Sequence, residues 1–517
     1  MKSTTGARAF GAALDQEWLN RWPAFAILSL IATIPLLVVD FPPLVDLYGH
    51  LGRYAVQTDI HNRPEIQQYF SYEWRLIGNL GADLLVQVLH SWLGLEMAVH
   101  LIVILTQLIA TLAVMLLSQE VHGRVTPFAI AALPLNYGFA FNYGFLNFCL
   151  SMALGMLAFV VWMRLRRQGK PIASRLWLGL AGMVIWVCHA YGWAFLGLLC
   201  GSALLADAIG GKQRPSTALI HIVGEACPLL LPLAPMVVWR SESGGLALME
   251  WSLSYKLQGL VSVFRTKWAI LDIVSLFAVV SLIYWGIRNR LAAFDMRLSI
   301  AALVSFVSFL LLPSQVFGSM YADIRLAPYV LMTALLAISP QKSTSQTIKK
   351  LTLICLVFFA GRILTTGAAY IVQERSVSEV LPTLDSIPKG SSVAFFLVIP
   401  CTEQWGLRVL SHMGGVALAR RNVFANNQWQ APGVNPLIVH YPLATPFEHD
   451  PSQYVYAGEC KRPAYPTLSR ALEEFPHPAF SHVWIVGPLP DPLLVPQGLK
   501  PIPHAGQGAL YAVDHSL

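Results

Sequence analysis

The chain has 517 residues, of which 55% are hydrophobic and only 12% are charged. Because soluble domains carry about 25% charged residues, this composition excludes an ordinary cytosolic enzyme, a disordered scaffold and a nucleic-acid-binding protein. The 35 Lys and Arg residues outnumber the 28 Asp and Glu residues, and membrane proteins keep such an excess mainly in their cytoplasmic loops. The sequence therefore predicts a polytopic α-helical membrane protein.

Apolar runs define the expected membrane domain. A spanning helix needs about 20 mostly apolar residues, and fewer where protein surrounds it. Eleven runs are candidates: residues 24–41, 97–117, 125–140, 145–163, 175–188, 191–208, 217–238, 268–287, 298–313, 326–340 and 350–372. We therefore expect a transmembrane domain over residues 24–375 with about 11 helices.

Basic residues indicate the side on which each loop lies. If the eleven runs are correct, every basic cluster between spans falls on the same side. The clusters are Lys2, Arg8 and Arg21; Arg164, Arg166, Arg167, Lys170 and Arg175; Lys212 and Arg214; Arg288, Arg290 and Arg297; and Lys342, Lys349 and Lys350. Because positive residues stay inside, residues 1–23 are predicted to be cytoplasmic and the C-terminus periplasmic, in a bacterial inner membrane.

The stretch 76–93 is the main ambiguity, because a further span there would reverse the side of everything after it. Asn79, Asp83 and Gln87 recur at four-residue spacing and form one polar helical face. This pattern is typical of a helix that lies along the membrane surface. We therefore predict a large first periplasmic loop over residues 42–96.

The last part of the chain, residues 376–517, is rich in proline and contains no spanning run. Buried strands are predicted at residues 391–399, 483–486 and 509–513. Residues 407–420 are predicted to form a helix despite a glycine pair. This length suffices for a separate core, so we expect a small periplasmic α/β domain. Cys401 and Cys460 are the only cysteines outside apolar runs, and oxidation in that compartment makes them a candidate disulfide.

The first loop carries a candidate catalytic face. Two prolines, Pro42 and Pro43, stop the first span and can start another helix. In such a helix Asp46, His50 and Arg53 stand at i, i+4 and i+7 and share one face. An acid, an imidazole and a guanidinium at a membrane surface can transfer a proton, bind a metal or hold a phosphate. The alternative is a solvated face on which Asp46 pairs with His50 or Arg53.

Further polar residues belong to the same predicted side. Asn142 and Asn147 lie among aromatic residues, where amides can bond sugar hydroxyls and rings can stack on sugar faces. An interfacial aromatic belt would explain the rings but explains the asparagines less well. His189 lies at a span end, where a lone histidine is more often structural. Other candidates for sugar or acceptor binding are Glu73, Asn79, Asp83 and Asp323.

Positive residues on the outer side run against the usual charge bias, and an anionic ligand would explain them. Arg325 follows Asp323 by two residues and can hold a phosphate through paired hydrogen bonds, with snorkelling to the interface as the alternative. Lys256 and Arg265 lie in the outer loop 239–267.

Two charges, Glu225 and Arg362, lie inside predicted spans, where a charge is costly unless it is paired or functional. We interpret both as helix–helix pairing residues, because they lie away from the outer face. The chain contains no Walker loop, GxSxG, HExxH or zinc-type Cys/His cluster, which disfavours ATP-driven transport and serine hydrolysis.

Together these features resemble the GT-C superfamily, the integral-membrane glycosyltransferases that take sugars from polyprenyl-phosphate carriers. The similarities are the acid just after the first span (PPLVDLYGHLGR), the long first outer loop, the many spans and the C-terminal outer domain. The segments RLIGNLGADLL, FNYGFLNF and YADIRLAP resemble stretches of uncharacterised bacterial proteins of that layout. The chain departs from the family pattern in having no adjacent acidic pair in loop one and no WWDYG stretch.

The resemblance implies inverting transfer of a sugar from polyprenyl phosphate to a glycan or lipid acceptor. Asp46 would be the base, with His50 beside it, and a divalent cation, if one takes part, would be held by these two. The donor phosphate would be bound by Arg53, Arg325, Lys256 and Arg265. The expected partners are the donor, the acceptor and membrane lipids, with no nucleic acid.

Two alternatives stay open at this point. One is a polysaccharide polymerase or ligase that acts on lipid-linked chains, and the other is a non-enzymatic scaffold subunit of envelope polysaccharide assembly or export. A transferase needs Asp46, Arg325 and the asparagines of residues 142–147 to converge on one outer cavity. A scaffold would leave these residues scattered and solvated.

Overall fold

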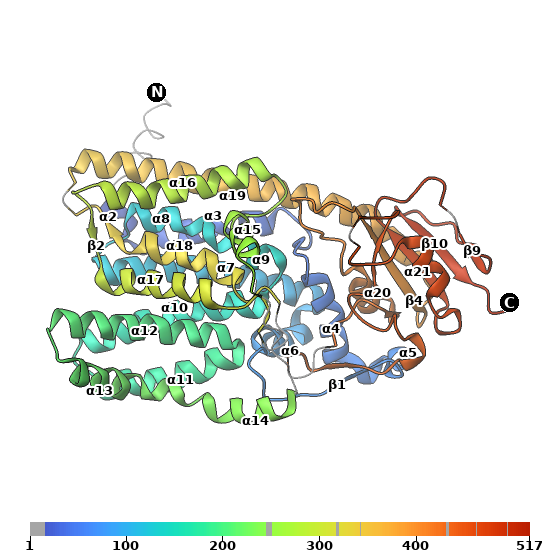
Figure 1. Ribbon diagram of the computed structural model, residues 1–517, viewed down its shortest axis with the longest axis horizontal. Helices are drawn as coiled ribbons and strands as arrows, with labels where there is room; N and C mark the ends of the chain where they lie inside the picture. Colours follow the sequence, from blue (N-terminus) through green and yellow to red (C-terminus); the bar gives the residue numbers. More distant parts are fainter. Residues whose placement is uncertain are drawn as a thin grey trace.

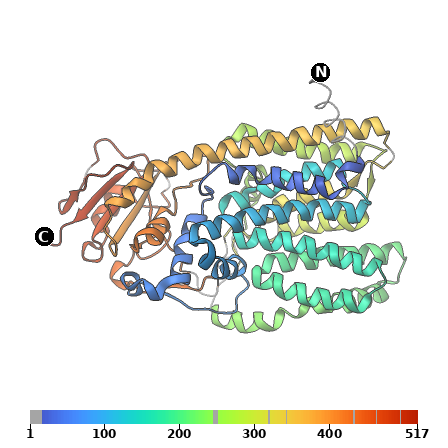
Figure 2. The same cartoon turned by 180° about the vertical axis from the view of Figure 1, so that it is seen from behind.

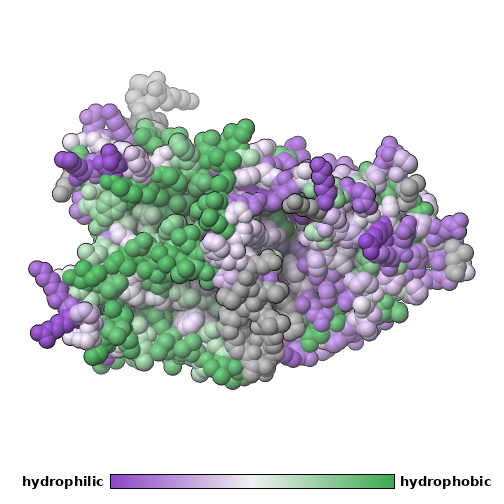
Figure 3. Space-filling view, in the orientation of Figure 1, coloured by the Kyte–Doolittle hydropathy of each residue, from purple (hydrophilic) through white to green (hydrophobic). Residues whose placement is uncertain are grey.

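The computed structural model describes residues 16–243, 251–316, 320–341, 343–430, 434–461, 463–493 and 495–516. A helical bundle occupies one end of the molecule, and an α/β domain built from the C-terminal part occupies the other (Figure 1). Apolar surface covers much of the bundle, whereas the α/β domain is mainly polar outside (Figure 3). The predicted helical membrane protein with a small C-terminal α/β domain is therefore confirmed.

In the described ranges, six helices are long and apolar enough to cross a membrane. They are α7 (Leu95–His122), α10 (Leu146–Arg167), α11 (Pro171–Cys188), α12 (Ala190–Gly210), α16 (Ala269–Arg288) and α19 (Ser345–Val380). The longest, α19, runs the length of the bundle and enters the α/β domain (Figure 2).

Five other predicted runs form shorter or interrupted helices, so the number of spans stays a prediction. Three of them are α3 (Trp22–Leu37), α17 (Met296–Leu311) and α18 (Ala327–Leu336). The run 125–140 divides into α8 (Pro127–Ala132) and a 3₁₀ turn, η2 (Leu133–Tyr137). The run 217–238 divides into α13 (Pro215–Ala226), η3 (Cys227–Leu230) and α14 (Leu233–Ser243). Prolines account for both interruptions, since each removes a helical donor and crowds the preceding turn.

The described basic clusters gather at the end of the bundle that lies away from the α/β domain (Figure 1). They form ion pairs there, in Arg164–Glu120 (2.9 Å), Arg166–Asp207 (3.0 Å) and Arg297–Asp295 (2.7 Å). Lys2, Arg8 and Lys342 lie outside the described residues. The positions of these basic residues in the sequence predicted that they would gather at one end of the bundle. That this end faces the cytoplasm stays a prediction.

The first loop folds onto the opposite end of the bundle. It contains α4 (Leu47–Asp59), η1 (Ile60–Asn62), α5 (Pro64–Gln67), β1 (Phe70–Tyr72) and α6 (Gly81–Leu93). The 13 residues of α6 span only about 20 Å, which is too short to cross a bilayer. In its predicted polar face Asp83 is fully buried and Gln87 is exposed, and the apolar Val88 and Trp92 are 66% and 85% exposed. The exposed apolar face suits a helix that lies on a membrane.

The α/β domain is built on a six-stranded mixed sheet. Its strands are β4 (Ser392–Ile399), β5 (Phe424–Ala425), β7 (Tyr454–Tyr456), β8 (His482–Val486), β9 (Leu499–Pro501) and β10 (Ala509–Val513). The central strand β4 is buried along all of its length and pairs in parallel with β5, β7 and β8. The three predicted strands are thus confirmed.

The predicted helix at 407–420 is shorter than expected, because α20 (Met413–Arg421) begins only at Met413. A separate strand, β6 (Leu437–Val439), leaves the α/β domain and pairs with β1 of the first loop. The loop and the domain are therefore joined through backbone hydrogen bonds.

A close helix crossing completes this junction. On α20, a Cβ atom at Gly415 would lie 2.3 Å from the carbonyl oxygen of Tyr48 on α4. On α4, a Cβ at Gly52 would lie 2.8 Å from the Cα of Gly415. Only glycine allows the two backbones to approach so closely, so Gly415, one of the two adjacent glycines of the predicted helix, lets α20 pack against α4.

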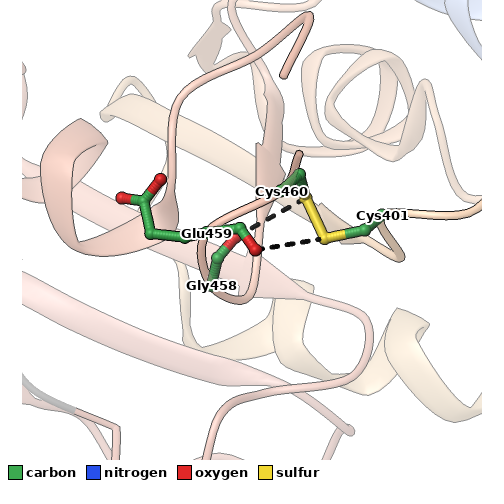
Figure 4. Close-up of a disulfide and its surroundings, with 4 residues drawn as sticks. All are labelled: Cys401, Gly458, Glu459 and Cys460. Atoms are coloured by element: carbon green, nitrogen blue, oxygen red, sulfur yellow. Dashed lines mark hydrogen bonds between the residues drawn. A yellow bond between two sulfur atoms is a disulfide. The ribbon is translucent and has the colours of Figure 1, made fainter. Parts of the chain in front are cut away.

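Three predicted pairings are confirmed. Cys401 and Cys460 form a disulfide with their Cα atoms 5.5 Å apart (Figure 4). In the bundle, Arg362 on α19 pairs with Asp272 on α16 at 2.9 Å. Glu225 on α13 pairs with Arg175 on α11 at 2.5 Å, so each of the two charges is paired with a residue of a neighbouring helix.

Candidate active site

A cavity of about 760 Å³ lies between the helical bundle, the first loop and the α/β domain. One wall of the cavity comes from α4, with Asp46 at its N-cap and His50 and Arg53 in its first two turns. The α/β domain contributes the opposite wall, including His412 and Asp450. The other predicted site residues on the lining are Asn79, Asn147, His189, Arg265 and Arg325.

Asp46 stands at the N-cap position of α4, directly after the chain has turned at its proline pair. Its backbone N–H donates to the carbonyl of Tyr143 at 2.9 Å, which ties it to the aromatic segment before α10. Gly144 has φ +98° and no room for a Cβ, which would lie 3.0 Å from the Asp46 nitrogen. The close approach of Gly144 to the Asp46 backbone holds the Asp46 carboxyl at the cavity, where the Asp46 side chain is 14% exposed.

The environment of Asp46 favours its protonated form. Burial raises the pKa of Asp46 well above its usual value, the negative charge of Asp450 adds to the rise, and Arg325 opposes it. A carboxyl with a raised pKa is a stronger base once it is ionised, which suits proton transfer near neutral pH.

His50 and Arg53 share the cavity wall with Asp46, as the spacing predicted, but their partners differ from the expected ones. Arg53 pairs with the fully buried Asp83 at 2.9 Å. The His50 ring packs on Trp429 at 5.1 Å, and its Nδ1 is buried without a hydrogen-bond partner. Burial lowers the pKa of His50 well below its usual value, so the ring is neutral. The surface ion pair with Asp46 is therefore not formed.

Arg325 is the buried cation of the cavity without a carboxylate partner. It lies in η4 (Ile324–Leu326), is 6% exposed, and stacks its guanidinium 3.5 Å from the ring centroid of Phe145. No carboxylate among the described residues lies within ion-pair distance of it, and its buried Nε has no hydrogen-bond partner. A planar guanidinium with free donors is suited to phosphate.

Asn147 links the cavity wall to the loop helices. Its side-chain amide donates to the Asp83 carboxylate at 3.0 Å and to the carbonyl of Asn79 at 2.9 Å. His189 lines the same wall and accepts a hydrogen bond from the Tyr191 N–H at 3.1 Å. These groups form the polar part of a wall that is otherwise aromatic.

Several predicted site residues do not reach the cavity. Lys256 is buried against Asp323 at 2.9 Å, and its ammonium also donates to two backbone carbonyls. Both residues are therefore partnered within the protein and lie outside the cavity lining, and their expected roles stay predictions. The fully buried Asp83 pairs with Arg53. The side-chain carbonyl of Asn142 accepts a hydrogen bond from the Tyr370 hydroxyl on α19 at 2.7 Å.

Two more assignments change with the structure. Glu73 pairs with Arg75 on the exposed surface at 2.6 Å and lies outside the cavity lining. Arg265 lines the cavity, but its guanidinium is bonded to Glu403 at 3.0 Å and to the carbonyl of Trp405 at 2.7 Å. It therefore has fewer free donors than Arg325.

The site residues predicted from the sequence all precede the α/β domain, so the individual residues that this domain contributes were not predicted. His412, Trp429, Asp450 and Arg408 all line the cavity from segments that precede or follow its strands. None of these residues carries a local pattern that points to the first loop. Only the glycine pair after His412 hinted that a backbone comes close there.

The divalent cation considered from the sequence finds no ready ligand set. Among the described residues, no group of three His, Cys, Asp or Glu side chains is arranged to hold a metal ion. His50 and Asp46 lie on one wall, but His50 packs between aromatic rings. We assign no step to a metal.

No protein-family model matches this chain, and no curated protein matches it either. Two solved structures of ArnT from Cupriavidus metallidurans align with it, one in the apo state and one bound to undecaprenyl phosphate. They are 11% and 12% identical, cover 95% of this chain and 97% of their own, and have TM-scores of 0.49 and 0.48. At this degree of likeness, function has to be argued from the cavity itself.

Proposed function

We propose that this protein is a membrane glycosyltransferase that moves a sugar from a polyprenyl-phosphate carrier to a periplasmic glycan or lipid acceptor. One observation carries the proposal: the partly buried Asp46 carboxyl and the unpaired, buried Arg325 guanidinium line the same cavity. An acid–base group and a free cation are the two elements that glycosyl transfer from a phosphate needs. The cavity lies where an apolar bundle meets a polar domain, which suits a lipid-linked donor.

The proposed reaction is a single displacement with inversion. Asp46 removes the proton of an acceptor hydroxyl as the oxygen attacks the anomeric carbon. The bond from this carbon to the phosphate oxygen breaks, and the electron pair leaves with polyprenyl phosphate. Arg325 binds the phosphate as its charge increases, and a charge-assisted contact is stronger in a buried site than in water.

The remaining lining suits a sugar. Asn147 and Asn79 place amides on one wall, and Tyr143 and Tyr321, with ring centroids 5.1 Å apart, provide aromatic faces. A volume of about 760 Å³ lies in the range of small-molecule sites, which supports a donor with few sugar units. The convergence of these groups argues against a pure scaffold, which would leave them apart.

The proposed location is the bacterial inner membrane, with the cavity and the α/β domain in the periplasm. This orientation follows from the basic clusters at the far end of the bundle. A reporter that is active only outside the cytoplasm should be active when fused after Leu517 and silent when fused at Lys212. The reverse result would place the cavity on the cytoplasmic side.

Transfer by the purified protein, measured with a panel of polyprenyl-phosphate sugars, tests the function. Asp46→Asn should lower turnover by about 10²- to 10⁴-fold, because the amide cannot accept the proton. Asp40→Asn is the matched control: this exposed acid lies at the end of α3 and outside the cavity lining. Full activity of Asp46→Asn at equal membrane abundance would remove the base. Failure of the wild type with every donor would favour the scaffold.

A further inference from the structure

The α/β domain places a histidine directly against Asp46. The Nε2 atom of His412 lies 3.6 Å from the Oδ1 atom of Asp46, and His412 is 3% exposed. The Nδ1 atom of the same ring lies 3.3 Å from the carbonyl oxygen of Asn427. A carbonyl can only accept, so Nδ1 carries the hydrogen of the neutral ring and Nε2 has a free lone pair facing the carboxyl.

This ring is held in position from several directions. Trp429 packs on it with a centroid distance of 4.4 Å. His412 is the residue that precedes α20, and the glycine contact between α20 and α4 sets its distance from the start of α4. The charged and titratable groups around the pair are Asp450, Arg325, His50, Tyr143 and Tyr454. The position therefore depends on the docked α/β domain.

We infer that His412 is the proton acceptor behind Asp46, so that the α/β domain completes the acid–base machinery of the first loop. The inference rests on the proposed function and adds a positioning residue to it. In the step, the acceptor hydroxyl gives its proton to one carboxyl oxygen of Asp46. The other oxygen of Asp46 passes its proton to Nε2 of His412, which becomes an imidazolium. The acceptor oxygen forms the new glycosidic bond, and the phosphate leaves with the electron pair of the broken bond.

The pKa shifts of the two groups describe the resting state of the pair. Burial raises the pKa of Asp46 and lowers the pKa of His412, although Asp450 partly opposes the second shift. Both shifts favour the neutral forms of the two groups, a protonated carboxyl and an imidazole whose Nε2 lone pair faces it. A protonated Asp46 alone cannot act as a base, whereas a carboxyl that hands its proton onward can. Catalytic hydrogen bonds are often long without substrate and shorten when it binds, so 3.6 Å is compatible with transfer.

Two substitutions separate proton transfer from simple packing. His412→Gln places an amide where Nε2 lies and can hydrogen-bond to Asp46, but it cannot take up a proton. His412→Asn keeps a donor toward Asn427 and removes the group that faces Asp46. His61→Gln, at an exposed histidine of the first loop, is the matched control. Both His412 variants should lower kcat by about 10²-fold or more with KM unchanged, and the control should not.

The pH profile gives the readout that packing alone would not move. Wild-type kcat should fall on the acid side when the pair takes up a second proton. In both His412 variants Asp46 must ionise by itself, and its raised pKa should move this acid limb to higher pH. Wild-type kcat and an unmoved limb in His412→Gln would overturn the inference while leaving the glycosyltransferase intact.

An infrared titration of the Asp46 carboxyl provides a test that does not need turnover, with Asp46→Asn used to assign the band. The titration midpoint should differ between the wild type and His412→Gln, and it should be the same in His61→Gln. An identical midpoint in the wild type and both His412 variants would refute the proton pair. A shifted midpoint in a protein that transfers no sugar would keep the pair and reject the proposed function.

Discussion

Gly415→Ala tests whether the packing of α20 on α4 sets the geometry of the site. The added Cβ would lie 2.3 Å from the carbonyl oxygen of Tyr48, where ordinary contact begins at 3.4 Å. A backbone oxygen inside a helix cannot rotate away, so α20 must retreat by about 1.1 Å, the difference between these distances. His412 precedes α20 and would move with it, away from Asp46.

A displacement of this size should have a large effect on the catalytic rate and a moderate effect on the folding free energy. A misplacement of about 1 Å can cost about 10²-fold in rate, and overpacking costs about 1–3 kcal/mol of folding free energy. Gly415→Ala should therefore lower kcat by about 10²-fold in the transfer assay. Thermal unfolding in detergent should show a folded protein of reduced stability.

Gly458→Ala is the matched control, because a Cβ at this position of the same domain meets no atom within 4 Å. It should retain wild-type stability and rate. If Gly415→Ala transfers sugar at the wild-type rate, the contact between α20 and α4 does not control the distance between Asp46 and His412. Hydrogen exchange in α4 and α20 would then show whether the helices had moved at all.

Three further predictions address the rest of the site and its support. Arg325→Ala should raise KM for the donor and lower kcat, and Arg325→Lys should restore only part, because a lysine cannot stack on Phe145 or bind a phosphate through a planar fork. Arg53→Ala leaves the buried Asp83 unpaired and should lower the free energy of unfolding by about 3–5 kcal/mol in denaturation experiments, with an unchanged value contradicting the buried pair. Cys460→Ser should destabilise the α/β domain by about 2–4 kcal/mol, and mass spectrometry of the unreduced wild type should show the bridge to Cys401.

Composition and local periodicity were enough to predict the architecture. Runs of apolar residues specify bundle helices because lipid offers no partner for an open backbone. The buried strands at 391–399, 483–486 and 509–513 were equally visible, since a strand covered on both faces reads as a short apolar run. That Arg362 and Glu225 would each have a partner could also be predicted, because an unpaired charge in lipid is too costly to keep.

The face shared by Asp46, His50 and Arg53 could also be predicted, because helical spacing is a local property. The partners of these residues could not. Arg53 pairs with Asp83, and Lys256 with Asp323, because folding brings segments that are far apart in the chain together as buried ion pairs. A buried ion pair and a ligand-binding pair consist of the same residue types, so the sequence does not distinguish them.

Only the tertiary structure shows which residues of the α/β domain line the cavity. His412 has no neighbour in sequence that indicates a role, and its contact with Asp46 depends on two glycine-containing helices that meet at backbone distance. In the sequence the two adjacent glycines lower the helical propensity of their segment, and in the fold Gly415 and Gly52 lack the side chains that would separate α20 from α4. Local patterns report the face that a residue occupies, whereas the groups opposite that face depend on contacts between segments far apart in the chain.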